Sequence, residues 1–262
     1  MDRILTIIDK EWAEVFKNRI VLFTIGFMPL IFTILPLAIL FFSRNGDMQG
    51  ADVADLPPSF RAACGNIAPA DCLQIFLVNQ FLILFMMMPL IIPVAIAAYS
   101  IVGEKTTRSL EPLLATPITT VELLAAKSLA AAIPAIVATW ACFVIFIVAA
   151  PFVGAKPVVV ASIFSPVWLV AVFVAGPLMA IMAVNFAVIV SSRVNDPRVA
   201  EQMAAVIIVP LLGMLFGQLA GVIVLNVQFM LAAVSIIWII DVGLSYLGAR
   251  LVQRETILTK WK

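Results

Sequence analysis

The sequence predicts an all-α integral membrane protein with six transmembrane helices. Of its 262 residues, 64% are hydrophobic and only 12% are charged, and the mean hydropathy is +1.16. Soluble domains contain about 45–50% apolar residues, so this composition excludes a soluble fold. Six charge-poor stretches reach the ~20 residues that a spanning helix needs. The predicted spans are residues 20–42, 74–102, 128–152, 163–191, 202–224 and 229–249.

The distribution of Lys and Arg predicts the orientation. With six spans both termini lie on one side, and of the sixteen basic residues only Arg44, Arg61 and Lys156 fall on the other. Basic residues gather on the cytoplasmic side of membrane proteins. We therefore expect a multi-pass protein of the cell membrane, embedded in the lipid bilayer, with both termini in the cytoplasm. The net charge of +1 gives no reason to expect nucleic acid as a partner.

Residues 1–19 have the pattern of an amphipathic helix that precedes the first span. On a helical wheel one arc is apolar and the opposite arc is charged, with Ile7 as the one apolar exception. The apolar arc holds Ile4, Leu5, Ile8, Trp12, Val15 and Phe16, and the charged arc holds Arg3, Asp9, Lys10, Glu14 and Lys17. This pattern predicts a helix in the membrane interface with Trp12 at headgroup level. Contact with a cytoplasmic partner is the alternative.

The longest predicted outside loop, residues 43–73, is acidic and contains the pair Pro57-Pro58, which indicates an irregular cap. Cys64 and Cys72 both lie in it. An outside loop is an oxidising location in many cells, so the two residues are candidates for a disulfide. Two unpaired cysteines fit the spacing equally well.

Residues 103–127 form a charged segment between the second and third predicted spans, and its charges place it in water. Pro117 disfavours helical geometry at Thr116. Thr119 and Glu122 have the spacing of a capping box, which predicts that a new helix begins there. The sequence therefore predicts two short helices with a break between them in this segment.

A glycine-rich run, residues 213–221, lies late in the fifth predicted span. It allows two interpretations. In the first, the run breaks the span into a shallow re-entrant hairpin. In the second, it provides a stripe of small residues for close helix packing, formed by Gly213, Gly217 and Gly221.

The residue types argue against catalysis by this chain. It has no His, which excludes histidine-based catalysis and histidine metal ligation, its three scattered Cys give no metal-binding spacing, and no phosphate-binding loop occurs. We expect no cofactor, no metal and no enzyme activity in this chain. If ATP is used, another protein chain must hydrolyse it. Asp241 lies deep in the last span, which suggests a cation or proton site. Alternatively its carboxyl group is neutralised or hydrogen-bonded locally, by Ser245, by Asn185 or by a residue of a second subunit.

The segment 103–127 resembles the loop after the second span in the ABC transporter type 2 permease family. The matching residues are Glu104, the run LEPLLATP at 110–117, and Glu122 to Lys127. The amphipathic N-terminal helix, the six spans, the long outside loop and the basic tail 250–262 are also similar, so the resemblance covers the whole chain as one permease domain.

The resemblance implies that 103–127 is the coupling loop that docks on a separate ABC ATPase. The contact residues it implies are Glu104, Arg108, Leu110, Glu111, Leu113 and Leu114. It also implies ATP and Mg on that ATPase, a second permease copy or a related permease as partner, and export of a substrate. An ion-coupled carrier or channel that uses Asp241 is the alternative.

Overall fold

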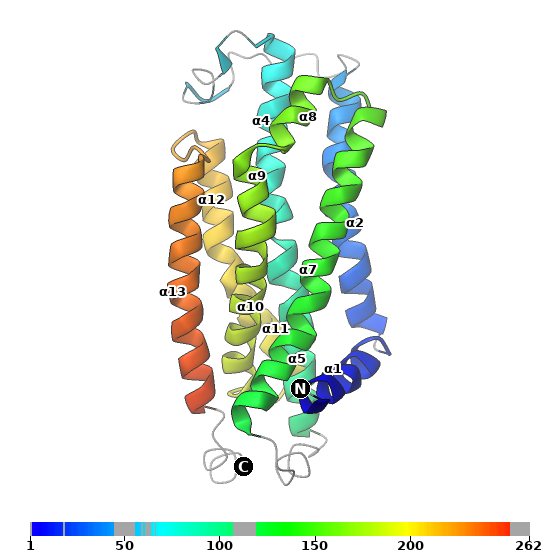
Figure 1. Ribbon diagram of the computed structural model, residues 1–262, viewed down its shortest axis with the longest axis vertical. Helices are drawn as coiled ribbons and strands as arrows, with labels where there is room; N and C mark the ends of the chain where they lie inside the picture. Colours follow the sequence, from blue (N-terminus) through cyan, green and yellow to red (C-terminus); the bar gives the residue numbers. More distant parts are fainter. Residues whose placement is uncertain are drawn as a thin grey trace.

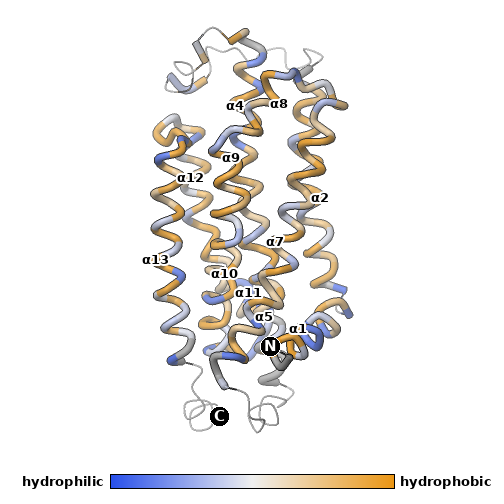
Figure 2. The backbone as a smooth tube through the Cα atoms, in the orientation of Figure 1, coloured by the Kyte–Doolittle hydropathy of each residue, from blue (hydrophilic) through white to orange (hydrophobic). Residues whose placement is uncertain are grey.

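The computed structural model describes residues 2–17, 19–44, 56–58, 60, 64–65, 67–106 and 119–251. Throughout these residues the regular structure is helical, and six stretches are long and apolar enough to cross a membrane. The prediction of an all-α protein with six spans is confirmed. Figure 1 shows the spans as one elongated bundle, and Figure 2 shows hydrophobic residues along its length with hydrophilic ones gathered near its ends.

Several of the six spans are built from more than one helical segment. The segments are, in order, α1 (Asp2–Val15), α2 (Arg19–Arg44), α4 (Pro69–Phe85), α5 (Met88–Thr106), α7 (Thr120–Phe152), α8 (Pro157–Ile163), α9 (Pro166–Val170), the π-helix η2 (Ala171–Ala175), α10 (Gly176–Ser191), α11 (Pro197–Ala204), the 3₁₀-helix η3 (Ala205–Ile208), α12 (Val209–Leu219) and α13 (Val227–Leu251). The second span comprises α4 and α5, the fourth α8 to α10, and the fifth α11 to α12.

Prolines explain where these spans are interrupted. A proline has no N–H to donate, and its ring clashes with the carbonyl four residues earlier, so the turn before it departs from α geometry. The helix α4 ends at Phe85, four residues before Pro89. The π-helix η2 precedes Pro177, and the 3₁₀-helix η3 precedes Pro210.

The core of the bundle is centred on α5, which packs against α7, α10 and α11. Further out, α2 packs on α7, and α13 packs on α10. A fully buried tryptophan, Trp168, joins α9 to this core. Its ring stacks on Phe143 with the ring centres 5.9 Å apart, and its indole nitrogen donates to Asn79 at 3.3 Å. Polar side chains inside the bundle thus hold neighbouring spans together.

The two ends of the bundle differ in character. One end carries α1, the C-terminal end of α5 and the first turns of α7, and α1 lies across it (Figure 1). Arg193, Arg198 and Arg250 lie at the ends of the helices that reach it. We call this the basic end.

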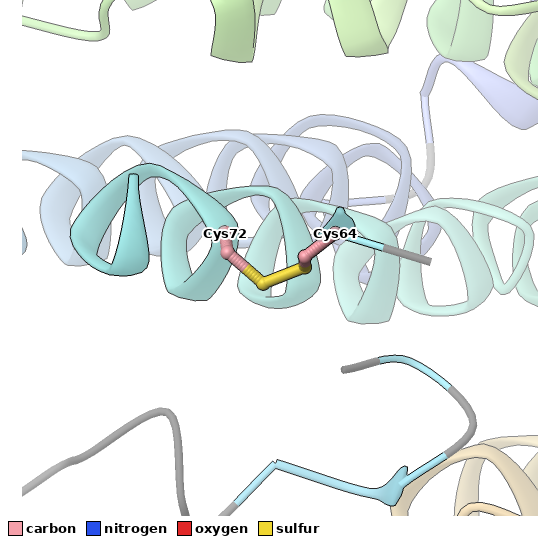
Figure 3. Close-up of a disulfide and its surroundings, with 2 residues drawn as sticks. All are labelled: Cys64 and Cys72. Atoms are coloured by element: carbon pink, nitrogen blue, oxygen red, sulfur yellow. A yellow bond between two sulfur atoms is a disulfide. The ribbon is translucent and has the colours of Figure 1, made fainter. Parts of the chain in front are cut away.

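At the opposite end a disulfide joins Cys64 to Cys72, with their Cα atoms 5.8 Å apart (Figure 3). Cys72 belongs to the first turn of α4 and is buried in a small apolar cluster with Leu56 and Phe76. The bond therefore attaches the outside loop to the beginning of the second span.

The glycine-rich run ends a helix rather than forming either predicted arrangement. Instead of continuing to residue 224, α12 ends at Leu219. Gly221 follows with a φ of +74°, and its N–H donates to the Gln218 carbonyl while the Val222 N–H donates to Gly217. This is a Schellman cap, which requires a residue that tolerates positive φ. The glycine stripe finds no support within the described residues, because none of them lies within 4 Å of where a Gly213 side chain would begin.

Candidate functional site

The helix α1 docks on the first turns of α7 at the basic end. Ile7 and Ile8 are buried against Leu123, Ala126 and Ala130. The Trp12 indole N–H donates to the Ala130 carbonyl at 3.0 Å, and its expected position at headgroup level stays a prediction. The tryptophan therefore fixes α1 to the third span.

The apolar arc of α1 divides into two parts. Ile7, the apparent exception, is buried together with Ile8 and Val15, whereas Leu5 and Phe16 are exposed. One side of the helix thus packs against the bundle, and the neighbouring side keeps an apolar surface that suits contact with lipid.

A buried ion pair lies between α1 and the bundle. The Lys127 Nζ is 2.7 Å from the Glu11 Oε1, and the two side chains are only 6% and 3% exposed. Lys127 also donates to the Ser100 hydroxyl at 2.8 Å, and this hydroxyl donates to the Glu11 Oε2 at 2.5 Å. Burial of a charge is costly unless it is both paired and hydrogen-bonded, and here the three side chains satisfy one another.

This Glu11–Ser100–Lys127 cluster joins the two helices that flank residues 107–118. Ser100 lies in the last turns of α5, and Lys127 lies two turns into α7. The first turn of α7 is fixed by the predicted capping box, which is confirmed: the Glu122 N–H donates to the Thr119 hydroxyl, and the Thr119 N–H donates to the Glu122 carboxylate. The path of the chain into and out of the segment is therefore held at both sides.

The residues implied as ATPase contacts fall mostly where the structure gives no description. Arg108, Leu110, Glu111, Leu113 and Leu114 lie outside the described residues, and Glu104 is placed only as part of the α5 main chain. Their contacts remain a prediction.

Glu11 and Ser100 were missed as functional candidates, although the sequence holds a signal for Glu11. Ile4, Ile8, Glu11 and Val15 have the spacing i, i+4, i+7 and i+11, which is the apolar stripe of a packed helix. An acid in such a stripe is expected to be buried and to need a cation. Ser100 carries no comparable signal.

A second polar group lies inside the bundle between α10 and α13. Asp241 is 6% exposed, and neither of its carboxylate oxygens has a hydrogen-bond partner among the described residues. The amide of Asn185 interacts with this carboxyl group, outside hydrogen-bond geometry, and it donates to the Ser245 hydroxyl at 2.9 Å. The structure thus brings the two predicted intramembrane residues together.

Two cavities flank α13 near Asp241. The first, of about 360 Å³, lies between α7, α10 and α13 and is lined in part by Asn185 and Ser245. The second, of about 560 Å³, lies between α10, α12 and α13 and has almost wholly apolar walls, including Phe186 and Ile240.

Six apolar spans and a helix docked across the basic end define a multi-pass membrane protein. The family model described as ABC-2 family transporter protein matches residues 5–247, so the chain belongs to this family. Family membership confirms the resemblance and makes the chain an ABC transporter permease, which in general works with an ABC ATPase. No curated protein matches the chain.

Proposed function

We propose that this chain is the membrane subunit of an ATP-driven exporter. A separate ATPase binds residues 103–127 and hydrolyses ATP with Mg at its own site. Two permease copies, or this chain and a related permease, form the path through the membrane. Movement of the ATPase displaces the attached spans and changes which side of the path is open.

The observation that supports this proposal most directly is the Glu11–Ser100–Lys127 cluster. It links α1, α5 and α7 through side chains that are buried and mutually bonded. A force applied to the segment between α5 and α7 therefore acts on three helices together. This is what a coupling loop requires, because a loosely held loop would move without moving the spans.

The orientation needed for ATP access has two kinds of support. Basic residues favour the cytoplasmic side, and α1, Arg193, Arg198 and Arg250 lie at the basic end. Disulfides persist in oxidising compartments outside the cytoplasm, and the Cys64–Cys72 bond lies at the opposite end. Both arguments support a cytoplasmic position for the basic end, where ATP is found.

A pull-down tests the proposal. The tagged permease, purified from its own host in mild detergent, should bring down an ABC ATPase with measurable ATP hydrolysis. Leu113→Asp should remove the ATPase from the complex, because a charge replaces an apolar contact. Ile67→Asp, an exposed position at the opposite end, is the matched control and should retain it. The proposal fails when the unaltered permease binds no ATPase, or when Leu113→Asp binds it as well as the control.

An ion-coupled carrier or channel is a second candidate function, favoured by the buried carboxylate of Asp241, which has no hydrogen-bond partner in the part of the chain that the structure describes. Such a protein would move its substrate in response to an ion gradient without ATP. Transport by the permease alone in proteoliposomes, abolished by Asp241→Asn, would favour this function over ATP-driven export.

A further inference from the structure

Asp241 carries the one acidic side chain that the structure buries deep in a span without a hydrogen bond, among the residues it describes. It lies ten residues before the end of α13, which is about 15 Å along the helix axis from the basic end. An ionised carboxylate at this depth is costly unless a positive charge compensates it. In its ionised form this carboxylate would therefore need a cation, and the described side chains place none beside it.

The basic side chains of the neighbouring helices have other partners. Lys127 of α7 is bound to Glu11 and Ser100. Arg250 of α13 lies about 13 Å further along its helix, over the Tyr246 ring at 4.7 Å from its centre. From α10 the neighbouring polar group is the neutral Asn185 amide. In the described part of the chain, no positive group of α7, α10 or α13 pairs with Asp241.

The cavity of about 360 Å³ between α7, α10 and α13 has both polar and apolar walls, and Asp241 itself does not line it. Its polar lining residues are Ser128, Asn185 and Ser245, and Ser245 is one helical turn beyond Asp241. Leu124, Leu129, Ile181 and Val188 form apolar walls. The Asp241 oxygens have no free surface themselves, so a ligand in the cavity would have to displace side chains to reach them, such as the hydrogen-bonded Asn185 and Ser245.

We propose that Asp241, Asn185 and Ser245 bind an organic monocation, a protonated amine that carries an apolar body. One carboxylate balances one positive charge, and the acceptor oxygens of Asn185 and Ser245 match the remaining N–H groups of an ammonium. The apolar walls cover the body of the ligand. A hard metal ion fits less well, because it requires about six oxygen ligands, and three side chains supply fewer.

The inference that such amines are exported rests on the proposed export function. The inference that they bind to this site does not. The test therefore uses the full-length permease alone in nanodiscs, without ATPase or ATP. The probes are 4-phenylbutylamine and 4-phenylbutan-1-ol, which share an apolar body and differ in charge. Binding is measured by titration calorimetry and by the shift in thermal unfolding temperature.

The unaltered permease should bind the amine at least about tenfold more tightly than the alcohol, the factor expected for a charge-assisted hydrogen bond. Asp241→Asn should abolish this preference and leave the alcohol unaffected. Ser235→Ala is the matched control on α13, because this exposed hydroxyl donates only to its own helix at the Leu231 carbonyl. It should keep the full preference for the amine.

Asn185→Leu provides a second variant that leaves the carboxylate in place. Its larger apolar side chain replaces one of the polar lining residues, so amine binding should fall while Asp241 is unchanged. This variant decides the question when Asp241→Asn yields no folded protein.

Equal binding of amine and alcohol, or amine binding that survives both variants, would overturn the proposal. Stabilisation by sodium chloride alone, dependent on Asp241 and without an amine effect, would replace it with an inorganic cation site. None of these outcomes bears on the ATPase pull-down, so the failure of one proposal is distinguishable from the failure of the other.

Discussion

The buried carboxylate of Glu11 contributes to the attachment of α1 to the bundle. In Glu11→Gln the Lys127 ammonium keeps its buried position but loses its counterion. Removal of one partner of a buried pair costs about 3–5 kcal/mol, so we expect the free energy of unfolding in mixed detergent micelles to fall by this amount. Glu14→Gln on the same helix is the control: its side chain is 51% exposed, and we expect a change below about 1 kcal/mol.

The double variant Glu11→Met with Lys127→Met separates the loss of a partner from the removal of charge. Apolar replacements of both members of a buried pair are often neutral or stabilising. The double variant should therefore recover most of the stability lost in Glu11→Gln. A loss in Glu11→Gln as small as that of Glu14→Gln would contradict the buried pairing.

Single residues also show where sequence reasoning succeeds and where it stops. The capping box of Thr119 and Glu122 could be predicted because its two members are three residues apart and act on one helical turn. Glu11 and Lys127 are separated by 116 residues. Periodicity marks Glu11 as a buried acid, but only the fold identifies its partner.

At the scale of helices, the predicted number of spans is confirmed, and the helices that contain the spans have ends of their own. The third span was expected to begin at residue 128, yet α7 begins at Thr120. Hydropathy detects the stretch that lipid tolerates, whereas the helix begins where a cap satisfies its first N–H groups. The polar turns before residue 128 therefore belong to the helix, and they carry Lys127 and the surface on which α1 docks.

The end of α12 yields a prediction about one glycine. Gly221 has a φ of +74°, and a Cβ atom there would lie 2.6 Å from the Cβ of Pro57. Gly221→Ala should therefore lower the free energy of unfolding by about 1–3 kcal/mol, through backbone strain and this contact. Gly243→Ala, inside α13 with no atom within 4 Å of the added Cβ, is the control. It should leave stability unchanged or raise it by up to about 1 kcal/mol. Equal effects would show that Gly221 is not needed as a cap.

At the scale of the whole molecule, composition predicted the class of protein. It could not predict which spans are central in the bundle and which are peripheral. Every span is apolar on most of its surface, so the hydropathy pattern does not distinguish the central α5 from the peripheral α13. The difference lies in side-chain size and contacts: α5 is buried nearly throughout, whereas α13 exposes large apolar residues such as Trp238 and Ile239. Those exposed surfaces suit lipid or a second permease copy.

The orientation of the whole molecule can be tested with two single substitutions. Val158 lies in α8 at the end that carries the disulfide, and Val199 lies in α11 at the basic end; both side chains are exposed. A membrane-impermeant maleimide should label Val158→Cys in intact cells and Val199→Cys only in inside-out vesicles. The native cysteines give little background, because Cys142 is buried and Cys64 is bonded to Cys72.

The reverse labelling pattern would place the basic end outside the cell. The coupling segment would then face a compartment without ATP, and ATP-driven export through this chain would be excluded whatever its family. Labelling of both variants from both sides would show only that the membranes are leaky. The unaltered protein, carried through the same vesicle preparations, is the control for labelling of the native cysteines. The orientation therefore tests the charge argument, the disulfide argument and the proposed mechanism at once.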